Sequence, residues 1–310
     1  MPGRPGKERV SVDRSRLPTE GNNPRTADID TLDPRAILDR LHAEDRRAVE
    51  AVGEVLDDVA AAVDVVVHAF QSGGRLVYVG AGTSGRLGVL DAVECPPTFG
   101  TDPAMVQAIL AGGPEAMWRS REGAEDAEEG GAAAVAGLAV ETRDVVFGIA
   151  AGSTTPFVIG ALREAIRRGA ATVFLTCVPP ADVPIASEVD VVVAPLTGPE
   201  AIAGSTRLKA GTATKLVLNM VTTASMVRLG KTYGNLMVDL RVTAAKLEDR
   251  GRRILRDLLG VGYEEAGELL EAAGGRVKTA LVMHRRGVGR EEAERLLAEA
   301  GGFLRKAWEE

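Results

Sequence analysis

Apolar residues in the middle of the chain form short continuous runs, each followed by polar or helical-period segments. The runs span residues 76–79, 105–110, 145–150, 173–177 and 189–194. Strands that are buried on both faces of a sheet have such continuous runs, whereas strands with one solvated face alternate. Strands that alternate with helices form parallel sheets with right-handed crossovers. The pattern therefore predicts an α/β fold with a doubly wound, parallel five-stranded sheet flanked by helices.

The regions on either side of these runs have irregular or helical patterns. Residues 1–32 are rich in Pro, Arg, Asn and Asp and are predicted to form a partly disordered N-terminal arm. Asp33-Pro34 is a typical helix start, so the main domain, predicted over 33–247, begins with leading helices. Leucines separated by glycine breaks predict a C-terminal bundle of three or four short helices over 248–310.

Charge and composition exclude several classes of partner. The net charge is −7, acidic and basic residues are interspersed, and aromatic residues make up 4% of the chain. A nucleic-acid partner is not expected, because no basic stripe is available to follow a phosphate backbone. The chain has no run of about 18 apolar residues and its charged start has no apolar signal segment, so neither a membrane partner nor secretion is expected. The predicted location is the cytoplasm.

The cysteines and histidines do not group into a recognisable site. Cys95 and Cys177 are far apart, and His42, His68 and His284 stand singly, without metal-ligand spacing. The sequence therefore predicts neither a disulfide framework nor a metal site. No cofactor is expected.

A glycine-rich turn over residues 80–86 follows the first apolar run directly. Such a turn aims backbone N–H groups and the positive end of a helix dipole at one point, which favours an anion. The hydroxyls of Thr83 and Ser84, beside Gly82, indicate a small phosphorylated ligand. A dinucleotide would need an acidic residue at the end of the second strand, and residues 111–113 provide none, so a nicotinamide oxidoreductase is the least favoured enzyme class.

A second turn of the same form follows the third apolar run. It contains Gly152, Ser153, Thr154 and Thr155, and Pro156 then suits the first turn of a helix. The two turns follow strands that are expected to be neighbours, so they are predicted to share one anion pocket. The second turn is predicted to be the main phosphate cradle, because its three hydroxyls converge with the free N–H groups of a helix start.

The loop after the fifth run carries hydroxyls and cations towards the same rim. Ser205 and Thr206 are predicted to cap a long helix over 206–229. Arg207 and Lys209 place positive charge nearby, which suits recognition of substrate hydroxyls or a carboxylate. Ser205, Arg207 and Lys209 are therefore candidate substrate-binding residues, against the alternative of a capped helix with surface cations.

Two acidic features are candidates for proton transfer. Glu94 precedes Cys95-Pro96-Pro97, and the diproline is expected to stop the preceding helix, which leaves Glu94 near its C-terminal end. Residues 122–129 form an acidic helical run that begins after Trp118. Most of this run is expected to be a solvated face, and its composition alone selects no catalytic residue.

Several of these segments closely resemble the N-acetylmuramic acid 6-phosphate etherase family. The similar segments are 80–86, 90–97, 122–126, 198–212 and 234–239, with the arm segment 19–23. The resemblance runs from about residue 18 to the C-terminus. Its motifs are longer and more specific than a lone glycine pattern.

The resemblance implies a fold, a reaction and two catalytic residues. The core is similar to the sugar isomerase (SIS) domain, and the tail resembles a small ubiquitin-associated-like helical module. The family cleaves the lactyl ether of N-acetylmuramic acid 6-phosphate, yielding N-acetylglucosamine 6-phosphate and D-lactate. It is cytoplasmic, homodimeric and metal-free, and serves cell-wall amino-sugar recycling. Its two catalytic glutamates correspond to Glu94 and Glu125 of this chain.

One segment departs from the family pattern, and two other functions use the same fold. Many members read Ser-Gly-Arg-Thr-Pro where this chain has residues 152–156, which keep the hydroxyls without the arginine. An aldose–ketose sugar-phosphate isomerase would also remove a C2 proton, but it needs no acid at C3. A non-catalytic, sugar-phosphate-sensing protein such as the glucokinase regulatory protein is the other alternative, and the presence of both glutamates argues against it.

Overall fold

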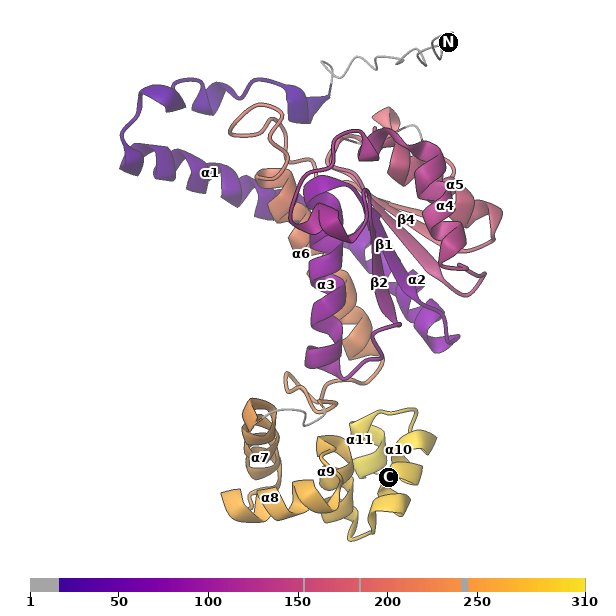
Figure 1. The fold of residues 1–310 in the computed structure, drawn as a ribbon. Helices are drawn as coiled ribbons and strands as arrows, with labels where there is room; N and C mark the ends of the chain where they lie inside the picture. Colours follow the sequence, from indigo (N-terminus) through magenta and orange to yellow (C-terminus); the bar gives the residue numbers. More distant parts are fainter. Residues whose placement is uncertain (1–16, 153, 184, 241–244, 310) are drawn as a thin grey trace.

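The predicted parallel sheet is present in the computed structural model, which describes residues 17–152, 154–183, 185–240 and 245–309 (Figure 1). Within these residues the strands are β1 (Leu76–Gly80), β2 (Val106–Leu110), β3 (Val145–Ile149), β4 (Ala171–Leu175) and β5 (Val191–Val193). All pairs are parallel, and the order is β2-β1-β3-β4-β5. This confirms the predicted α/β fold class, and each strand end lies within two residues of the predicted one.

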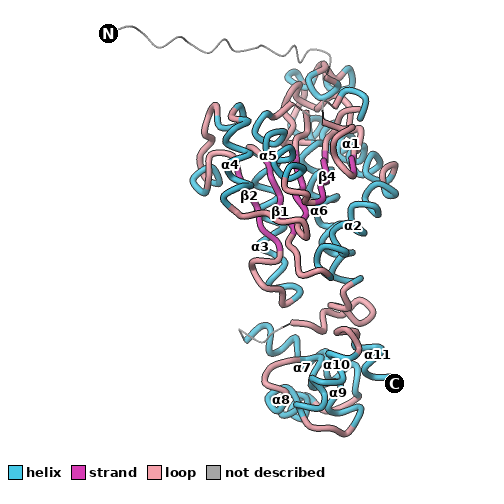
Figure 2. Tube along the Cα trace, turned by 90° about the vertical axis from the view of Figure 1, so that its right-hand side faces the viewer, coloured by secondary structure: helices cyan, strands magenta, loops and turns pink. Residues whose placement is uncertain are grey.

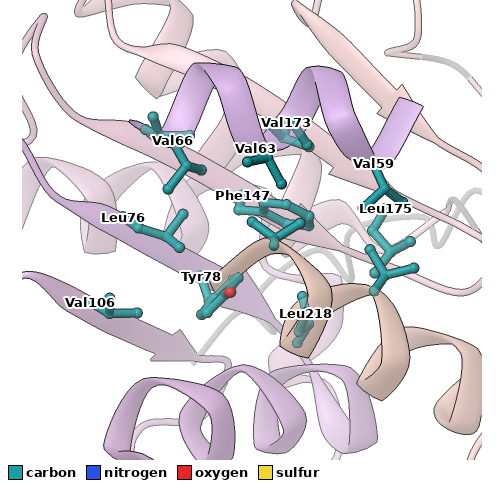
Figure 3. Packing of buried hydrophobic residues seen from close by; sticks show 14 of the residues in the cluster. Val59, Val63, Val66, Leu76, Tyr78, Val106, Phe147, Val173, Leu175 and Leu218 are labelled. Carbon is teal, nitrogen blue, oxygen red and sulfur yellow. The ribbon is translucent and has the colours of Figure 1, made fainter. Parts of the chain in front are cut away.

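Helices cover both faces of this sheet (Figure 2). They are α2 (Leu56–Gln71), α3 (Gly82–Phe99), α4 (Glu128–Gly137), α5 (Pro156–Arg167) and α6 (Lys209–Arg228), and α1 (Pro34–Gly53) packs against α6. Leu76 and Tyr78 pack with α2, α3 and α6 on one face (Figure 3), whereas Val77 and Val79 pack with α4 and α5 on the other. Successive side chains of a strand point to opposite faces, so the continuous apolar runs fill two cores at once.

Helix α3 continues through the diproline, contrary to the sequence expectation. It runs to Phe99 and ends at Gly100, which has the left-handed conformation (φ 64°) typical of a helix C-cap. Pro96 and Pro97 lack the N–H groups that would bond to the carbonyls of Ala92 and Val93. Each proline therefore removes one intrahelical hydrogen bond, and the helix nevertheless continues for two residues beyond Pro97.

Helix α6 begins at Lys209, so Ser205 and Thr206 are not its caps as predicted. The carboxylate of Glu200 accepts the backbone N–H groups of Lys209 and Ala210, each at 2.9 Å. A carboxylate at a helix N-terminus also interacts favourably with the helix dipole. The cap is therefore a buried glutamate from the preceding loop, and the hydroxyls of the loop are left for other contacts.

The C-terminal part of the described chain has five helices rather than the three or four that were predicted. They are α7 (Ala245–Leu259), α8 (Tyr263–Ala272), α9 (Val277–Arg286), α10 (Arg290–Glu299) and α11 (Leu304–Glu309). Their apolar faces form a core of their own, which also takes in Val238 and Leu240 from the segment before α7. The predicted division into arm, main domain and bundle at 32 and 247 stays a prediction.

The described part of the N-terminal arm is folded onto the main domain. It forms three short turns, η1 (Pro18–Glu20), η2 (Pro24–Thr26) and η3 (Ile29–Thr31). The backbone N–H of Gly204 donates to the carbonyl of Thr19, and the hydroxyl of Thr26 donates to the carbonyl of Ala201. The arm is thereby attached to the loop that precedes α6.

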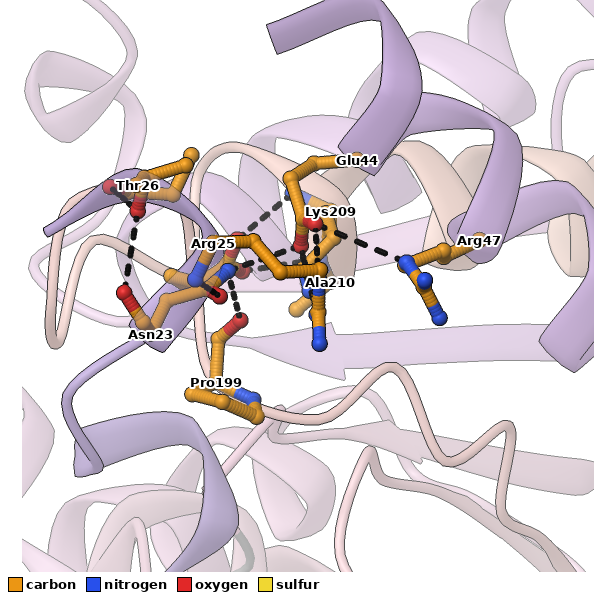
Figure 4. A network of polar contacts seen from close by, with 10 residues as sticks. Asn23, Arg25, Thr26, Glu44, Arg47, Pro199, Lys209 and Ala210 are labelled. Carbon is orange, nitrogen blue, oxygen red and sulfur yellow. Dashed lines mark hydrogen bonds and ion pairs between the residues drawn. The ribbon is translucent and has the colours of Figure 1, made fainter. Parts of the chain in front are cut away.

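A buried ionic cluster centred on Glu44 joins the arm, α1 and α6 (Figure 4). The carboxylate of Glu44 accepts from Arg25, from Lys209 Nζ at 2.6 Å and from Asn23 Nδ2 at 2.8 Å. Glu44 and Lys209 are both almost fully buried. The hydrogen bond from Arg25, followed by those from Lys209 and Asn23, holds the pKa of Glu44 at about 2 in spite of its burial.

We expect Glu44→Gln to lower the free energy of unfolding by about 3 kcal/mol at neutral pH, because it leaves the buried Lys209 cation without its partner. The carboxylate has a pKa near 4.5 when unfolded and about 2 when folded. Its contribution is therefore present above pH 4.5 and is lost as the pH falls towards 2. Urea unfolding followed by circular dichroism across this pH range measures both effects.

The matched control is Asp39→Asn on the same helix. Asp39 forms an exposed ion pair with Arg35 and should contribute no more than about 0.5 kcal/mol. The structural role of the cluster would be contradicted if the Glu44→Gln protein had the same free energy of unfolding as this control and lost stability in acid as the unsubstituted chain does.

Candidate functional site

A cavity of about 270 Å³ lies where β1 and β3 end and α3 and α5 begin. Ligands of doubly wound sheets bind at this edge, beyond the carboxyl ends of the strands. The structure brings both predicted hydroxyl-bearing turns to this one cavity. The lining residues among those turns are Gly82, Thr83, Ser84, Gly152, Thr154 and Thr155. Ser153 lies outside the described residues.

The helix starts at this cavity are suited to an anion. The N-cap residues are Ala81 for α3 and Thr155 for α5, and neither helix has a side-chain cap hydrogen bond among the described residues. The first N–H groups of an α-helix have no intrahelical partner and carry partial positive charge. Two uncapped helix starts, beside the four hydroxyl residues and two glycines of these turns, give a cradle for a phosphate group.

Glycines let α3 begin this close to β1. A Cβ on Gly80 would stand 2.6 Å from the backbone N of Gly85, and one on Gly85 would stand 2.5 Å from the carbonyl O of Gly80. Gly82 has a different task, because its φ of 53° is one that side-chain-bearing residues rarely adopt, and space is open around it. The glycine spacing thus serves a close helix–strand contact and one left-handed residue.

The cations of the loop before α6 do not reach the cavity. Thr206 lines it, but Ser205 and Arg207 are not among its lining residues, and Lys209 is directed into the ionic cluster with Glu44. Arg86, the last residue of the glycine-rich turn 80–86, donates from Nη2 to the carbonyl oxygen of Ala116 at 2.7 Å. No described lining residue of the cavity is cationic, so backbone N–H groups and hydroxyls provide its anion-binding capacity.

The two predicted catalytic glutamates lie in different places. Glu125 lines the cavity from η5 (Ala124–Asp126), a short turn that replaces the first part of the predicted acidic helix, whose second part is α4. Glu94 is exposed on α3, twelve residues beyond Gly82, or about 18 Å further along the helix axis. Within one chain the structure therefore brings Glu125, but not Glu94, to the cavity.

A buried carboxylate three residues before Glu94 fixes the rotation of α3. Asp91 accepts hydrogen bonds from Tyr78 Oη at 2.9 Å and from Asn219 Nδ2 at 2.7 Å. Burial raises the pKa of Asp91, and these hydrogen bonds oppose that shift. Because Asp91 ties α3 to β1 and α6, Glu94 is held on the outward side, next to the exposed Leu90 and Val93.

The sequence interpretation missed part of the cavity. Leu17 and Glu20 of the arm line it, as does Gly204 of the loop before α6. The carboxylate of Glu20 lies over Gly204, with Oε2 at 2.9 Å from the position that a Cβ would take there. The resemblance of the arm segment 19–23 to the family indicated that this segment has a functional role. Its residues alone did not show that it lines the cavity, because an isolated polar segment gives no information on its tertiary contacts.

The described residues contain neither a membrane-spanning helix nor a metal-binding cluster. No helix there combines the length and apolar character needed to cross a bilayer. No group of three or more His, Cys, Asp or Glu side chains in the same residues is arranged to hold a metal ion.

Comparison with known proteins identifies the family. The model of the glucokinase regulatory protein N-terminal SIS domain matches residues 58–166. Two relatives are named N-acetylmuramic acid 6-phosphate etherase. The one from Synechocystis sp. is 52% identical over 275 residues, which cover 89% of this chain and 90% of the relative. The one from Salinibacter ruber is 52% identical over 286 residues, which cover 91% of each chain.

A solved structure, phosphoheptose isomerase GmhA from Neisseria gonorrhoeae, aligns with a TM-score of 0.46 and 16% identity over 62% of this chain and 97% of that chain. The two etherase relatives are far more similar, and their identity extends over about nine-tenths of both sequences. This chain belongs to the N-acetylmuramic acid 6-phosphate etherase family.

Proposed function

We propose that this protein cleaves the lactyl ether of N-acetylmuramic acid 6-phosphate and releases N-acetylglucosamine 6-phosphate and D-lactate. Membership of the etherase family supports the reaction. The observation that carries the proposal is the cavity itself, in which two uncapped helix starts, several hydroxyls and the carboxylate of Glu125 face one space.

The phosphate group is proposed to bind at the two helix starts. The backbone N–H groups of Gly82, Thr83 and Ser84 open α3, and the turn at Thr154 and Thr155 opens α5. Ser153 belongs to the proposed cradle by its place in the sequence. Ser205, Arg207 and Lys209 remain proposed contacts from the sequence, although the structure assigns Lys209 to Glu44 instead of the cavity.

The reaction is proposed to proceed by elimination followed by addition. Opening of the sugar ring gives a C1 aldehyde, which acidifies the C2 proton, and the carboxylate of Glu125 removes that proton. The C3–O bond then breaks as Glu94, in its acid form, protonates the departing lactate oxygen. Water adds to the unsaturated aldehyde at C3, a proton returns to C2, and the ring closes. General acid–base assistance of this kind contributes about 10²–10⁴-fold each.

A homodimer is proposed to complete the site. Glu94 is too far along α3 to serve the cavity of its own chain, so a partner subunit would have to supply it. The surface around Glu94 suits such a contact, because Leu90 and Val93, on the same side of α3, are 48% and 58% exposed. Apolar residues at helical spacing on an unpartnered face favour helix packing against a second copy.

The reaction is proposed to take place in the cytoplasm, as part of the recycling of cell-wall amino sugars. The substrate is a phosphorylated cell-wall sugar, and its charge opposes diffusion across a membrane. The proposed products, a sugar phosphate and a hydroxy acid, are common starting compounds for cytoplasmic metabolism.

Incubation with N-acetylmuramic acid 6-phosphate should release D-lactate in equal amount to N-acetylglucosamine 6-phosphate. A coupled D-lactate assay and phosphorus NMR measure the two products. Formation of a ketose phosphate without lactate would instead identify an isomerase, and tight binding without turnover would identify a sensing protein.

Glu94→Gln should lower lactate release by about 10²–10⁴-fold, because the amide does not protonate the leaving oxygen. Exchange of the C2 hydrogen with deuterated water should remain measurable by NMR, since Glu125 is intact. Glu129→Gln, an exposed change in the first turn of α4 outside the cavity, is the control and should keep full activity. Lactate release at the normal rate by Glu94→Gln would refute the donor assignment.

Mixed dimers of Glu94→Gln and Glu125→Gln subunits should recover activity. If each site takes Glu94 from one subunit and Glu125 from the other, a mixed dimer has one intact site and up to half the activity of the unsubstituted dimer. Co-expression with two different affinity tags isolates the mixed dimer. If both glutamates of a site came from the same subunit, each site would carry one defect and the mixed dimer would stay inactive.

A further inference from the structure

The arm contributes a second carboxylate to the candidate site. Glu20 and Glu125 both line the cavity, and they are its two titratable side chains among the described lining residues. The side chain of Glu20 is exposed, and no hydrogen bond or ion pair is found for its carboxylate among the described residues. A carboxylate without a protein partner, facing a cavity lined by hydroxyls and N–H groups, is available to a ligand.

The position of Glu20 is fixed by the arm's attachments rather than by its own side chain. On one side Gly204 donates its backbone N–H to the carbonyl of Thr19, the neighbour of Glu20. A few residues further on, Asn23 and Arg25 bond to the buried carboxylate of Glu44. Leu17, which like Thr19 precedes Glu20, is partly buried and packs against the hydrophobic core on the side of the sheet that α4 and α5 cover. Glu20 therefore stands on an anchored segment and not on a free tail.

The proposed reaction begins with a proton transfer that is assigned to neither of the two glutamates. Glu125 removes the C2 proton and Glu94 protonates the lactate oxygen. The preceding step, ring opening, moves a proton from the C1 hydroxyl to the ring oxygen O5. The remaining described carboxylate of the cavity is Glu20.

We propose that Glu20 is the proton-transfer group that opens the sugar ring, an inference that rests on the proposed function. Its carboxylate accepts the proton of the C1 hydroxyl, whose O–H electron pair becomes the second bond of the C1 aldehyde. The C1–O5 bond breaks, its electron pair goes to O5, and O5 takes the proton from the carboxylic acid. Both oxygens are bonded to C1, so a single carboxyl group reaches both. The step consumes no other reactant.

The test follows ring opening directly. In Glu125→Gln protein the C2 proton stays in place, yet ring opening should still interconvert the α and β anomers of N-acetylglucosamine 6-phosphate. Saturation-transfer NMR measures this exchange against buffer alone. We expect the Glu125→Gln protein to exchange the anomers at least about 10²-fold faster than buffer alone, and the protein that combines Glu20→Gln with Glu125→Gln to lose nearly all of that acceleration.

The matched control is Asp30→Asn combined with Glu125→Gln. Asp30 is exposed on the same arm, does not line the cavity and loses the same charge, so this variant should exchange anomers like Glu125→Gln alone. Titration with N-acetylglucosamine 6-phosphate should show that all three proteins bind it within about threefold of one another. Addition of formate should partly restore exchange in a Glu20→Ala, Glu125→Gln protein, which a merely structural role of Glu20 would not allow.

Several results would overturn the assignment. One is an equal rate of anomer exchange in the Glu125→Gln protein with and without Glu20→Gln. Another is a rate in the Glu125→Gln protein no faster than in buffer. The third is a loss of exchange, on removal of Glu20, that is fully matched by a loss of ligand binding. The readout needs no lactate, so it is independent of the proposed function. Absence of D-lactate from the unsubstituted protein with N-acetylmuramic acid 6-phosphate would refute the etherase reaction, whereas anomer exchange decides the role of Glu20.

Discussion

The candidate site depends on the buried ion cluster in which Glu44 accepts hydrogen bonds from Lys209, Arg25 and Asn23. Lys209 comes from α6, and Arg25 and Asn23 come from the arm, in and directly before the turn η2, whereas Glu44 belongs to α1. A buried charge is costly unless it is paired, so the arm and the start of α6 are fixed relative to one another. The loop between β5 and α6 is fixed by the same contacts, and it brings Gly204 and Thr206 to the cavity.

The buried pairing also keeps Lys209 away from the cavity, none of whose described lining residues is cationic. A cation beside Glu20 or Glu125 would hold these carboxylates ionised and occupied, as Arg25 does for Glu44. In the proposed reaction these two carboxyl groups take up and release protons. Helix starts attract a phosphate through N–H groups of small partial charge, which form no ion pair with the glutamates. In the proposed function, different groups of the cavity therefore bind the phosphate and transfer protons.

The sequence predicted what depends on local pattern. Continuous apolar runs located all strands to within two residues, and the turns at 80–86 and 152–156 were expected at one pocket because neighbouring parallel strands end at the same edge. The sequence-based prediction was wrong where a contact with a residue elsewhere in the chain determines the position of a side chain. Lys209 was expected at the rim, but its partner Glu44 is 165 residues away, and Glu200 replaced Ser205 and Thr206 as the cap of α6. Glu20 entered the cavity through the same long-range attachment of the arm.

The position of Glu94 follows from a similar competition between local and tertiary effects. The diproline favours a helix end, but Asp91, one turn earlier, is tied to Tyr78 and Asn219, and Gly100 provides a left-handed cap three residues after Pro97. Helix α3 therefore remains helical past the cavity and presents Glu94 beside Leu90 and Val93. Within a single chain, this carboxylate lies on an exposed apolar helix face and does not line the cavity. Its position is understandable if that face packs against a second subunit, where the same carboxylate faces the neighbour's cavity.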